Sequence, residues 1–281
     1  MSEFDLCMLS FDVEDWFHAT NLKDMIGRDS WESKELRVKE NTKKLLSILD
    51  KYDTKATFFI LGWVAERVPN LVREIHLRGH EIACHGYEHE LVYNLSVDGF
   101  REDIRRSKNI LRDITGEKIL GYRAPCFSIT EWAIDVLKEE KFKYDSSFFP
   151  SMAHDRYGKL ISANKTNSVQ EVRSGFFEVL IPTLDFMGIR LPWGGGAYFR
   201  LIPYIFYKRG VRIISEDGGV FVFYLHSWEI DPLQPHVHGI KLQYKIRHYG
   251  GLRKTENKLK QLLKDFRFGT IKSGLGKLGL L

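Results

Sequence analysis

The chain has 281 residues, of which 43% are hydrophobic, so it can bury a substantial core, and we expect one α/β domain spanning 1–281. The net charge is +5, no apolar run is long enough to span a bilayer, and Asp5 interrupts any N-terminal secretory signal, so the default expectation is a cytoplasmic protein. The three cysteines lack a Cys-x-x-Cys spacing, which argues against a disulfide framework and against a Cys-rich zinc site.

Short apolar runs and helical repeats alternate through the first half of the chain. Each run is the length of a buried strand, and each repeat has the 3.6-residue spacing of an amphipathic helix. Such alternation predicts a parallel sheet covered by helices, of which a (β/α) barrel is the closed form. In chain order the expected elements are strand 6–13, helix 36–49, strand 56–61, helix 69–78, strand 81–84, helix 100–114, strand 119–122, helix 131–140 and strand 142–144.

The second half of the chain has a less regular pattern. Strands are expected at 176–181 and 220–225, with a glycine-rich loop at 192–197. That loop lacks the Lys-Ser/Thr of a phosphate loop and is not expected between a strand and a helix start, which argues against nucleotide binding. Lys and Arg are dense from Lys241 to Lys277, where we expect a basic helical extension. This extension is either a solvated face or a contact with an anionic glycan or a membrane surface.

Polar residues follow five of the expected strands. In a parallel sheet the carboxyl ends of strands meet at one edge, where loops carry the chemistry. The sequence therefore predicts a functional site built from residues at these strand ends, namely the acidic segment 12–15, His85, Arg123, Asp145 and His226.

His85 and His89 are four positions apart, which on a helical turn would put both imidazoles on one face within reach of a single ion. A catalytic divalent site also needs a third protein ligand, and Asp12, Glu14 and Asp15 are the candidates. If the strand continues, Asp12 and Glu14 project to the same side, so one is the base and the other the ligand. A bend would bring in Asp15 instead. The alternative is that these acids cap a loop or pair with lysines.

Five segments resemble, in order, the motifs of the polysaccharide deacetylases, also known as the NodB homology family or carbohydrate esterase family 4. They are LSFDVEDWF at 9–17, ATFF at 56–59, GHEIACHGYEH at 79–89, GYRAP at 121–125 and LH at 225–226. Three further segments resemble the bacterial subgroup found with exopolysaccharide and exosortase gene clusters. They are YDSS at 144–147, GGGAYFR at 194–200 and DFRFG at 265–269.

The resemblance implies a distorted (β/α) barrel with 7 or 8 parallel strands and one divalent metal, most often zinc. Its substrate would be an N-acetylhexosamine in a polysaccharide or in a lipid- or nucleotide-linked precursor, from which the N-acetyl group is hydrolysed. By position, Asp12 matches the general base, Arg123 the residue that orients it, and His226 the general acid. His85 and His89 match the metal histidines, and Asp145 falls where it could orient His226.

The sequence departs from the family pattern at three places. Asp-Val-Glu-Asp at 12–15 replaces the usual adjacent aspartates, so the third ligand is Glu14 or Asp15, and the strand argument favours Glu14. Cys126 stands where a tyrosine is frequent, which leaves a backbone N–H for an oxyanion but changes the pocket wall. Ser227 follows the histidine where the subgroup often has proline. Trp193 and Tyr198 around the glycine run are candidates to contact a sugar, or they serve packing alone.

Other functions remain open at this point. The same machinery would serve a hydrolase of a small cyclic or linear amide, or of an O-acetyl ester. A non-catalytic glycan-binding protein would be expected to lack the base or the acid, and both Asp12 and His226 are present. The basic residues are not interleaved with aromatics on a recognisable motif, so no nucleic-acid partner is expected. The expected partner is an N-acetylated glycan or sugar intermediate, inside the cell or at the inner face of its membrane.

Overall fold

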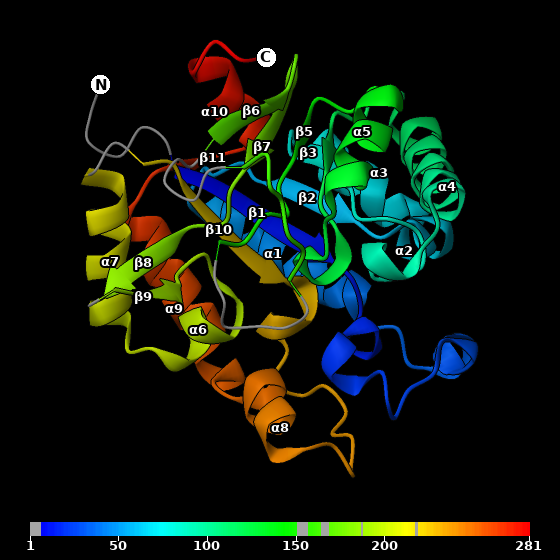
Figure 1. Cartoon of the computed structure of the whole chain (residues 1–281). Helices are drawn as coiled ribbons and strands as arrows, with labels where there is room; N and C mark the ends of the chain where they lie inside the picture. Colours follow the sequence, from blue (N-terminus) through cyan, green and yellow to red (C-terminus); the bar gives the residue numbers. More distant parts are fainter. Residues whose placement is uncertain (1–6, 151–156, 164–168, 187, 217–218) are drawn as a thin grey trace.

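A sheet of nine strands forms the centre of the computed structural model, which describes residues 7–150, 157–163, 169–186, 188–216 and 219–281 (Figure 1). The strand order is β10-β1-β2-β3-β4-β5-β7-β6, and β11 pairs with the start of β1. The strands of this sheet are β1 (Cys7–Val13), β2 (Thr57–Ile60), β3 (Glu81–Cys84), β4 (Gly121–Tyr122), β5 (Tyr144–Asp145), β6 (Val169–Arg173), β7 (Phe176–Val179), β10 (Phe221–His226) and β11 (Phe268–Gly269).

All neighbouring strands of this sheet run parallel except β6 and β7, which form an antiparallel pair. The parallel set therefore has eight strands. Since β10 and β6 are the two ends of the strand order, the sheet is an open, distorted barrel. This architecture confirms the predicted fold class. A separate hairpin of β8 (Thr183–Phe186) and β9 (Ile189–Pro192), which the sequence analysis did not anticipate, lies beside α7.

The helices of the first half cover the outer face of the sheet (Figure 1). Local signals set their ends: Pro69 begins α3, the Ser96 hydroxyl accepts a hydrogen bond from Gly99 N at the start of α4, and Gly116 ends that helix with a φ of 74°. The helices are α1 (Val38–Lys51), α2 (Gly62–Arg67), α3 (Pro69–Leu77), α4 (Val97–Thr115), α5 (Glu131–Glu139), α6 (Gly196–Leu201), α7 (Tyr204–Glu216), α8 (Leu242–Tyr249), α9 (Leu252–Asp265) and α10 (Ile271–Lys277).

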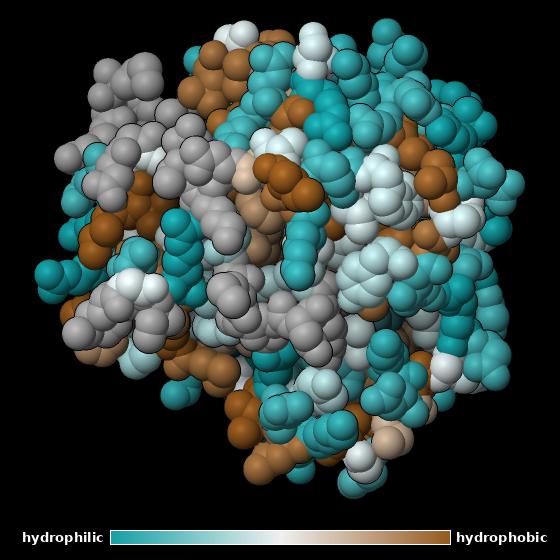
Figure 2. Space-filling model, viewed as in Figure 1, coloured by the Kyte–Doolittle hydropathy of each residue, from teal (hydrophilic) through white to brown (hydrophobic). Residues whose placement is uncertain are grey.

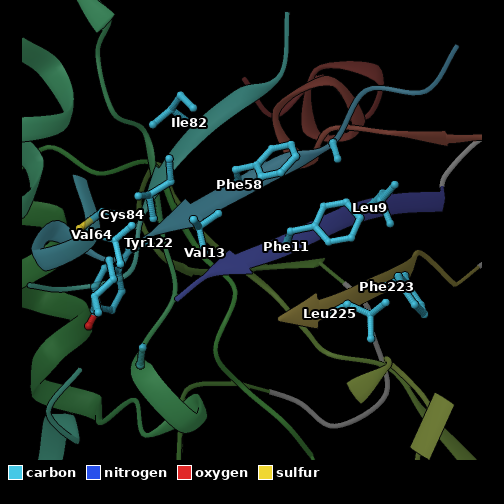
Figure 3. Packing of buried hydrophobic residues seen from close by; sticks show 14 of the residues in the cluster. Leu9, Phe11, Val13, Phe58, Val64, Ile82, Cys84, Tyr122, Phe223 and Leu225 are labelled. Carbon is cyan, nitrogen blue, oxygen red and sulfur yellow. The ribbon is translucent and has the colours of Figure 1, made fainter. Parts of the chain in front are cut away.

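The alternation of side chains along β1 divides the core into two layers. Leu9, Phe11 and Val13 point toward the helices, where they pack with residues of β2, β3 and β10 (Figure 3). Met8 belongs to the second layer, inside the curved sheet, which α10 closes with Ile271 and Leu275. The even-numbered residues of β1 therefore face the interior of the barrel, and Asp12 is the last of them.

Two expectations about the second half need revision. The segment from about 241, which was expected to be a helical extension, also contributes to the main sheet. Within it, β11 pairs with β1, and α10 packs into the core. The glycine run does lie between a strand and a helix, β9 and α6, contrary to expectation. Its close approach to β10 requires glycine: Gly195 has a φ of 145°, and a Cβ there would lie 1.9 Å from the Tyr224 carbonyl oxygen.

Among the described helices, none is both long and apolar enough to cross a membrane.

Candidate metal centre and active site

Three acidic or imidazole side chains converge at the carboxyl edge of the sheet. Glu14 follows the end of β1, His85 follows β3, and His89 lies four residues further along. One ligand atom from each of these residues lies within 4.8 Å of the other two. Glu14 and His85 are buried and His89 is partly buried. Two imidazoles and one carboxylate are a donor set typical of a catalytic divalent metal site.

The hydrogen bonds around these side chains leave the Nε2 lone pair of His85 and the Oε2 atom of Glu14 available to bind a metal. His85 Nδ1 lies 2.8 Å from the Arg123 carbonyl oxygen, so Nδ1 donates and Nε2 keeps its lone pair. Trp228 Nε1 donates to Glu14 Oε1 at 3.0 Å, and Glu14 Oε2 lies 2.6 Å from His89 Nε2 without a well-formed hydrogen bond. These residues therefore fit a bound cation, which would satisfy the buried Oε2 atom.

Protonation also suits metal binding. Burial lowers the pKa of His85 to about 4, so its ring is neutral near pH 7. Burial alone would raise the pKa of Glu14, but the neighbouring charges of His89 and His226 and the contact with His89 outweigh burial and hold that pKa well below its usual range. Glu14 is thus an anion beside a neutral imidazole.

The turn that presents the two histidines is not helical, contrary to the expectation from their spacing. Gly86 has a φ of 71° and His89 a φ of 55°, so the backbone reverses twice between them. Asp103 of α4 fixes the turn, because its carboxylate accepts hydrogen bonds from Tyr87 N at 2.8 Å and Glu88 N at 3.2 Å. A Cβ at Gly86 would lie 2.8 Å from Asp103 Oδ2. The left-handed glycine therefore lets that carboxylate approach.

Asp12 lies beside this cluster on the inner face of β1. Arg123 Nη1 donates to Asp12 Oδ1 at 2.8 Å, and both side chains are almost fully buried. The guanidinium is itself held on all sides: it donates to the Ser10 hydroxyl, the Ser146 carbonyl and the Ser146 hydroxyl, and it lies 4.1 Å from the centre of the Phe59 ring. The structure thus places Arg123 against Asp12, as the sequence predicted. The other hydrogen bonds of the guanidinium hold it in this position.

His226 ends β10 directly beside Asp12, which it faces in the parallel register. Its Nε2 lies 3.8 Å from Asp12 Oδ2 and 3.7 Å from Glu14 Oε1. Its Nδ1 lies 2.6 Å from Glu229 Oε1. Burial tends to lower the pKa of His226, but the hydrogen bond to Glu229 and the charges of Glu14, Glu229 and Asp12 raise it to about 9. The ring can therefore hold a proton near neutral pH.

Glu229, and not Asp145, contacts the imidazole of His226, so the expected role of Asp145 is wrong in this structure. Glu229 is fully buried, and Arg200 Nε donates to its second oxygen at 2.5 Å. The Arg200 guanidinium also donates to the carbonyls of Arg247 and Gly250 at the end of α8. Neither Glu229 nor Arg200 was predicted from the sequence.

Asp145 instead faces Glu178 on the neighbouring strand β7. It accepts a hydrogen bond from the Ser147 hydroxyl at 2.6 Å, while Glu178 Oε1 accepts from Ser147 N and Phe148 N. Burial raises the pKa of Asp145 to about 6 and, together with the Asp145 charge, raises that of Glu178 well above its usual range. The Glu178 carboxyl therefore keeps its proton to a higher pH than an ordinary glutamate, and the pair lies on β5 and β7 rather than beside His226 on β10.

Asp15 points away from the histidines. Its carboxylate accepts hydrogen bonds from Trp16 N, Arg37 N and Val38 N, so it caps the short turn η1 (Trp16–His18) and holds the start of α1. The alternative in which Asp15 is the third ligand has no support from this geometry, because the strand alternation carries Glu14 to the Asp12 side.

A pocket with a volume of about 120 Å³ opens over His89, Glu14 and His226. Cys126 and Tyr198, which the sequence analysis offered as candidates for substrate contact, are among the residues that line it. Trp193 does not: its ring stacks on Tyr207 at 5.5 Å and its Nε1 donates to the Tyr207 carbonyl, so it serves packing. The sequence analysis missed four aromatic residues of the wall, namely Phe127, Tyr157, Tyr224 and Trp228.

Two family models match adjoining parts of the chain. Polysaccharide deacetylase matches residues 28–144, and a domain of unknown function, DUF3473, matches residues 146–275. A peptidoglycan-N-acetylglucosamine deacetylase from Bacillus cereus is 35% identical over 103 residues, which cover 37% of this chain and 38% of that protein. The chain spans about a third of the length of the first curated relatives it matches.

Two solved structures share the fold. One is a structure from Mycobacterium smegmatis that is described as a polysaccharide deacetylase, with a TM-score of 0.62 at 19% identity. The match covers 97% of this chain and 90% of that chain. The other, a CE4 family pseudoenzyme from Bacillus anthracis, has a TM-score of 0.54 at 13% identity and covers 97% of this chain and 66% of its own. Because a pseudoenzyme shares the fold, the fold alone does not imply activity. The first half of the chain, residues 28–144, thus matches the polysaccharide deacetylase family, residues 146–275 match DUF3473, and the fold is shared with both solved structures.

Proposed function

We propose that the chain is a metal-dependent deacetylase that hydrolyses the N-acetyl group of an N-acetylhexosamine, either in a polysaccharide or in its lipid- or nucleotide-linked precursor. The observation that carries the proposal is the convergence of Glu14, His85 and His89 beside both Asp12 and His226. The family match and the deacetylase name of the Bacillus cereus relative support the same reaction. Zinc is the proposed metal because it suits two imidazoles and one carboxylate.

The residues of the site fit the needs of amide hydrolysis. Glu14, His85 and His89 would hold a divalent ion, which would polarise the acetyl carbonyl and lower the pKa of water toward roughly 7. Asp12, aimed by Arg123, is placed to take the proton of the attacking water. His226, with its Nε2 directed at the same space and its Nδ1 held by Glu229, is placed to protonate the departing nitrogen. Each such positioned group typically contributes about 10²–10⁴ in rate.

The pocket supports a sugar as substrate. It combines aromatic surface from Phe127, Tyr198 and Tyr224 with polar groups around the candidate metal ligands, the mixture that sugar rings require. The motifs at 144–147, 194–200 and 265–269, together with the DUF3473 match, support placing the chain in the exopolysaccharide-associated subgroup. We further propose that the substrate is an intracellular intermediate rather than a finished wall polymer.

The test is acetate release from N-acetylglucosamine oligomers and from nucleotide- and lipid-linked N-acetylhexosamines. The purified chain is assayed as isolated, after chelation, and after zinc is returned. We expect activity on at least one substrate, loss after chelation, and recovery with zinc. Asp12→Asn should lower kcat by about 10²–10⁴ because it removes the base.

The matched control is Asp113→Asn, the same change at an exposed carboxylate of α4, which should leave the rate unchanged. Circular dichroism would verify that both variants fold. Acetate release that survives chelation, or an Asp12→Asn variant with the native rate, would refute the proposal. Turnover of a small amide or of an O-acetyl ester, with none of the N-acetylated sugars, would establish the alternative hydrolase.

A further inference from the structure

The outer side of α6, α7 and α8 exposes large hydrophobic side chains. Ile205 is 73% exposed, Phe206 63% and Leu242 72%, while Leu201 and Ile246 are each about half exposed. Figure 2 shows hydrophobic surface over α6 and α8 at the lower edge of the molecule. We call these five residues the docking face. Solitary exposed aliphatic residues are common on soluble proteins, but a group of this size on neighbouring helices is not.

Leu201 lies close to both of the other helices that carry the docking face. Leu201 ends α6, and only Ile202 and Pro203 separate it from α7, which carries Ile205 and Phe206. Leu201 also lies against the end of α8, because a Cβ on Gly250 would be 2.9 Å from Leu201 Cδ2 and 2.4 Å from the Ile246 carbonyl. Leu201 is therefore near the start of α7 along the chain and near the end of α8 in space.

In the segment of chain that carries the docking face, exposed basic residues outnumber exposed acidic ones. Among the described residues from 196 to 267, one acidic side chain, Glu216, is exposed. The exposed basic residues in the same range number eight: Arg209, Arg212, Lys241, Lys245, Arg253, Lys254, Lys264 and Arg267. Exposed aliphatic and aromatic residues flanked by Lys and Arg are the composition of helices that lie in a membrane interface.

We propose that the docking face binds the surface of an anionic phospholipid bilayer, with the apolar side chains among the lipid headgroups and the basic side chains at the lipid phosphates. The charge argues against a second copy of the chain as the occupant. A two-fold dimer would place this face against itself and bring like charges together. A bilayer with anionic headgroups complements both its charge and its apolar residues.

The docking face adjoins the pocket. Tyr198 of α6 and Arg247 of α8 line the pocket wall, and these two helices also carry Leu201 and Ile246. A bilayer bound at this face would therefore lie beside the pocket. If the proposed deacetylase function holds, the substrate class this arrangement favours is a sugar attached to a membrane lipid. Binding to vesicles needs no catalysis, so it can be tested even if the proposed activity fails.

The experiment is co-sedimentation of the full chain with vesicles of phosphatidylcholine alone and of phosphatidylcholine with phosphatidylglycerol. We expect binding to the anionic vesicles, weakening as salt rises from 0.1 to 0.5 M. The double variant Ile205→Ser, Phe206→Ser should bind at least about tenfold more weakly, because two large apolar side chains leave the interface. The matched control is Leu77→Ser, which removes a 76% exposed aliphatic side chain from α3, and it should bind as the native chain does.

A second arm tests the charges. Arg209→Glu with Lys245→Glu should weaken binding to anionic vesicles by about fivefold or more for each charge reversed, with no effect on phosphatidylcholine alone. All these positions are exposed, so thermal melting should be unchanged. The proposal is overturned if the native chain does not sediment with anionic vesicles, or if the double variant binds as tightly as Leu77→Ser. Light scattering that shows a dimer, converted to a monomer by the double variant, would assign the face to a second copy instead.

Discussion

The two halves of the molecule build one site by different means. The first half, from β1 to β5, is a regular series of parallel strands and helices, and it supplies Asp12, the metal candidates and Arg123. The second half, which DUF3473 matches, mixes hairpins, short helices and long connections, and it supplies His226 with Glu229 and Arg200 behind it. The regular half thus holds the candidate metal ligands and the proposed base, while the irregular half holds the proposed acid and most of the aromatic wall.

A single turn connects these contributions. Directly after His226, the Ser227 hydroxyl donates to the Glu14 carbonyl at 2.6 Å and Trp228 Nε1 donates to the Glu14 carboxylate. The next residue in this turn, Glu229, contacts His226 Nδ1 through its carboxylate. The turn after β10 therefore positions both the candidate ligand of the first half and the acid of the second. Removal of either half would leave the site incomplete, which distinguishes this arrangement from a catalytic domain with an accessory domain.

The largest effect should come from the metal centre in the first half. Glu14→Gln removes the anionic ligand, and we expect affinity for zinc to fall by more than about 100-fold, since even changes to the partners of ligands cost about 10- to 100-fold. The measurement is calorimetric titration of the chelated protein with zinc, together with metal content of the protein as purified.

Asp15→Asn is the matched control for this prediction. Asp15 accepts backbone hydrogen bonds with both carboxylate oxygens rather than facing the histidines, and an amide can accept with only one oxygen, so Asp15→Asn should lower stability by about 1–3 kcal/mol while zinc affinity stays within a few-fold. Should Asp15→Asn lose zinc while Glu14→Gln keeps it, the third ligand would be assigned to the wrong acid.

A smaller effect should come from the second half through Glu229. Glu229→Gln replaces the charged partner of His226 Nδ1 with a neutral amide of the same shape. We expect kcat to fall by about 10- to 100-fold with little change in KM, which is less than the cost of removing the acid itself. Nitrogen NMR of His226 should show a change in the proportions of its ring protonation states, a signature that loss of packing alone would not produce.

Glu35→Gln provides the comparison for Glu229→Gln, because Glu35 is an exposed glutamate whose ion pair with Arg37 lies outside the pocket. Its kcat should match that of the native chain. An unchanged kcat in Glu229→Gln would mean that the second half positions His226 by its backbone alone.

The sequence predicted the regular half better than the irregular one for a physical reason. Alternation along β1 is a local property, so it correctly put Asp12 and Glu14 on one side of the strand and Asp15 on the other. Arg200 reaches Glu229 across 29 positions of the chain, and no local pattern reports such a contact. The position of Glu229 is a local pattern that could have indicated its contact with His226. Glu229 stands three residues after His226 in a capping box, the arrangement that starts a helical turn.

The same limit explains the errors at single residues. The spacing of His85 and His89 fits a helix, but the left-handed Gly86 places them by a turn whose anchor, Asp103, is distant in sequence. Trp193 follows a strand near the glycine run, a position that suits either a sugar contact or packing. The choice depends on Tyr207, against which its ring stacks, and this partner is known only from the fold.

The smallest effect we predict concerns the pair formed by Asp145 and Glu178, where the regular half of the sheet meets the irregular one across β5 and β7. The folded state holds a proton on Glu178 to a pH well above its usual range, because burial and the Asp145 charge oppose ionisation. A raised pKa in the folded state means that this stabilisation is complete below the unfolded value, roughly 4.3, and is lost as the pH rises through the folded value.

Glu178→Gln should therefore change how stability depends on pH more than stability itself. The glutamine can donate to Asp145 and still accept from Ser147 N and Phe148 N, but it cannot ionise. Between pH 5 and pH 9 the melting temperature of the native chain should fall relative to that of the variant, and a difference of about 1 kcal/mol would appear as roughly 2–4 °C. Asp15 and Asp103, whose pKa values burial raises to about 6, titrate in both proteins and cancel in this difference. Parallel melting curves across this range would show that the pKa of Glu178 is not raised in the folded state, and that the junction between the halves is held by packing instead.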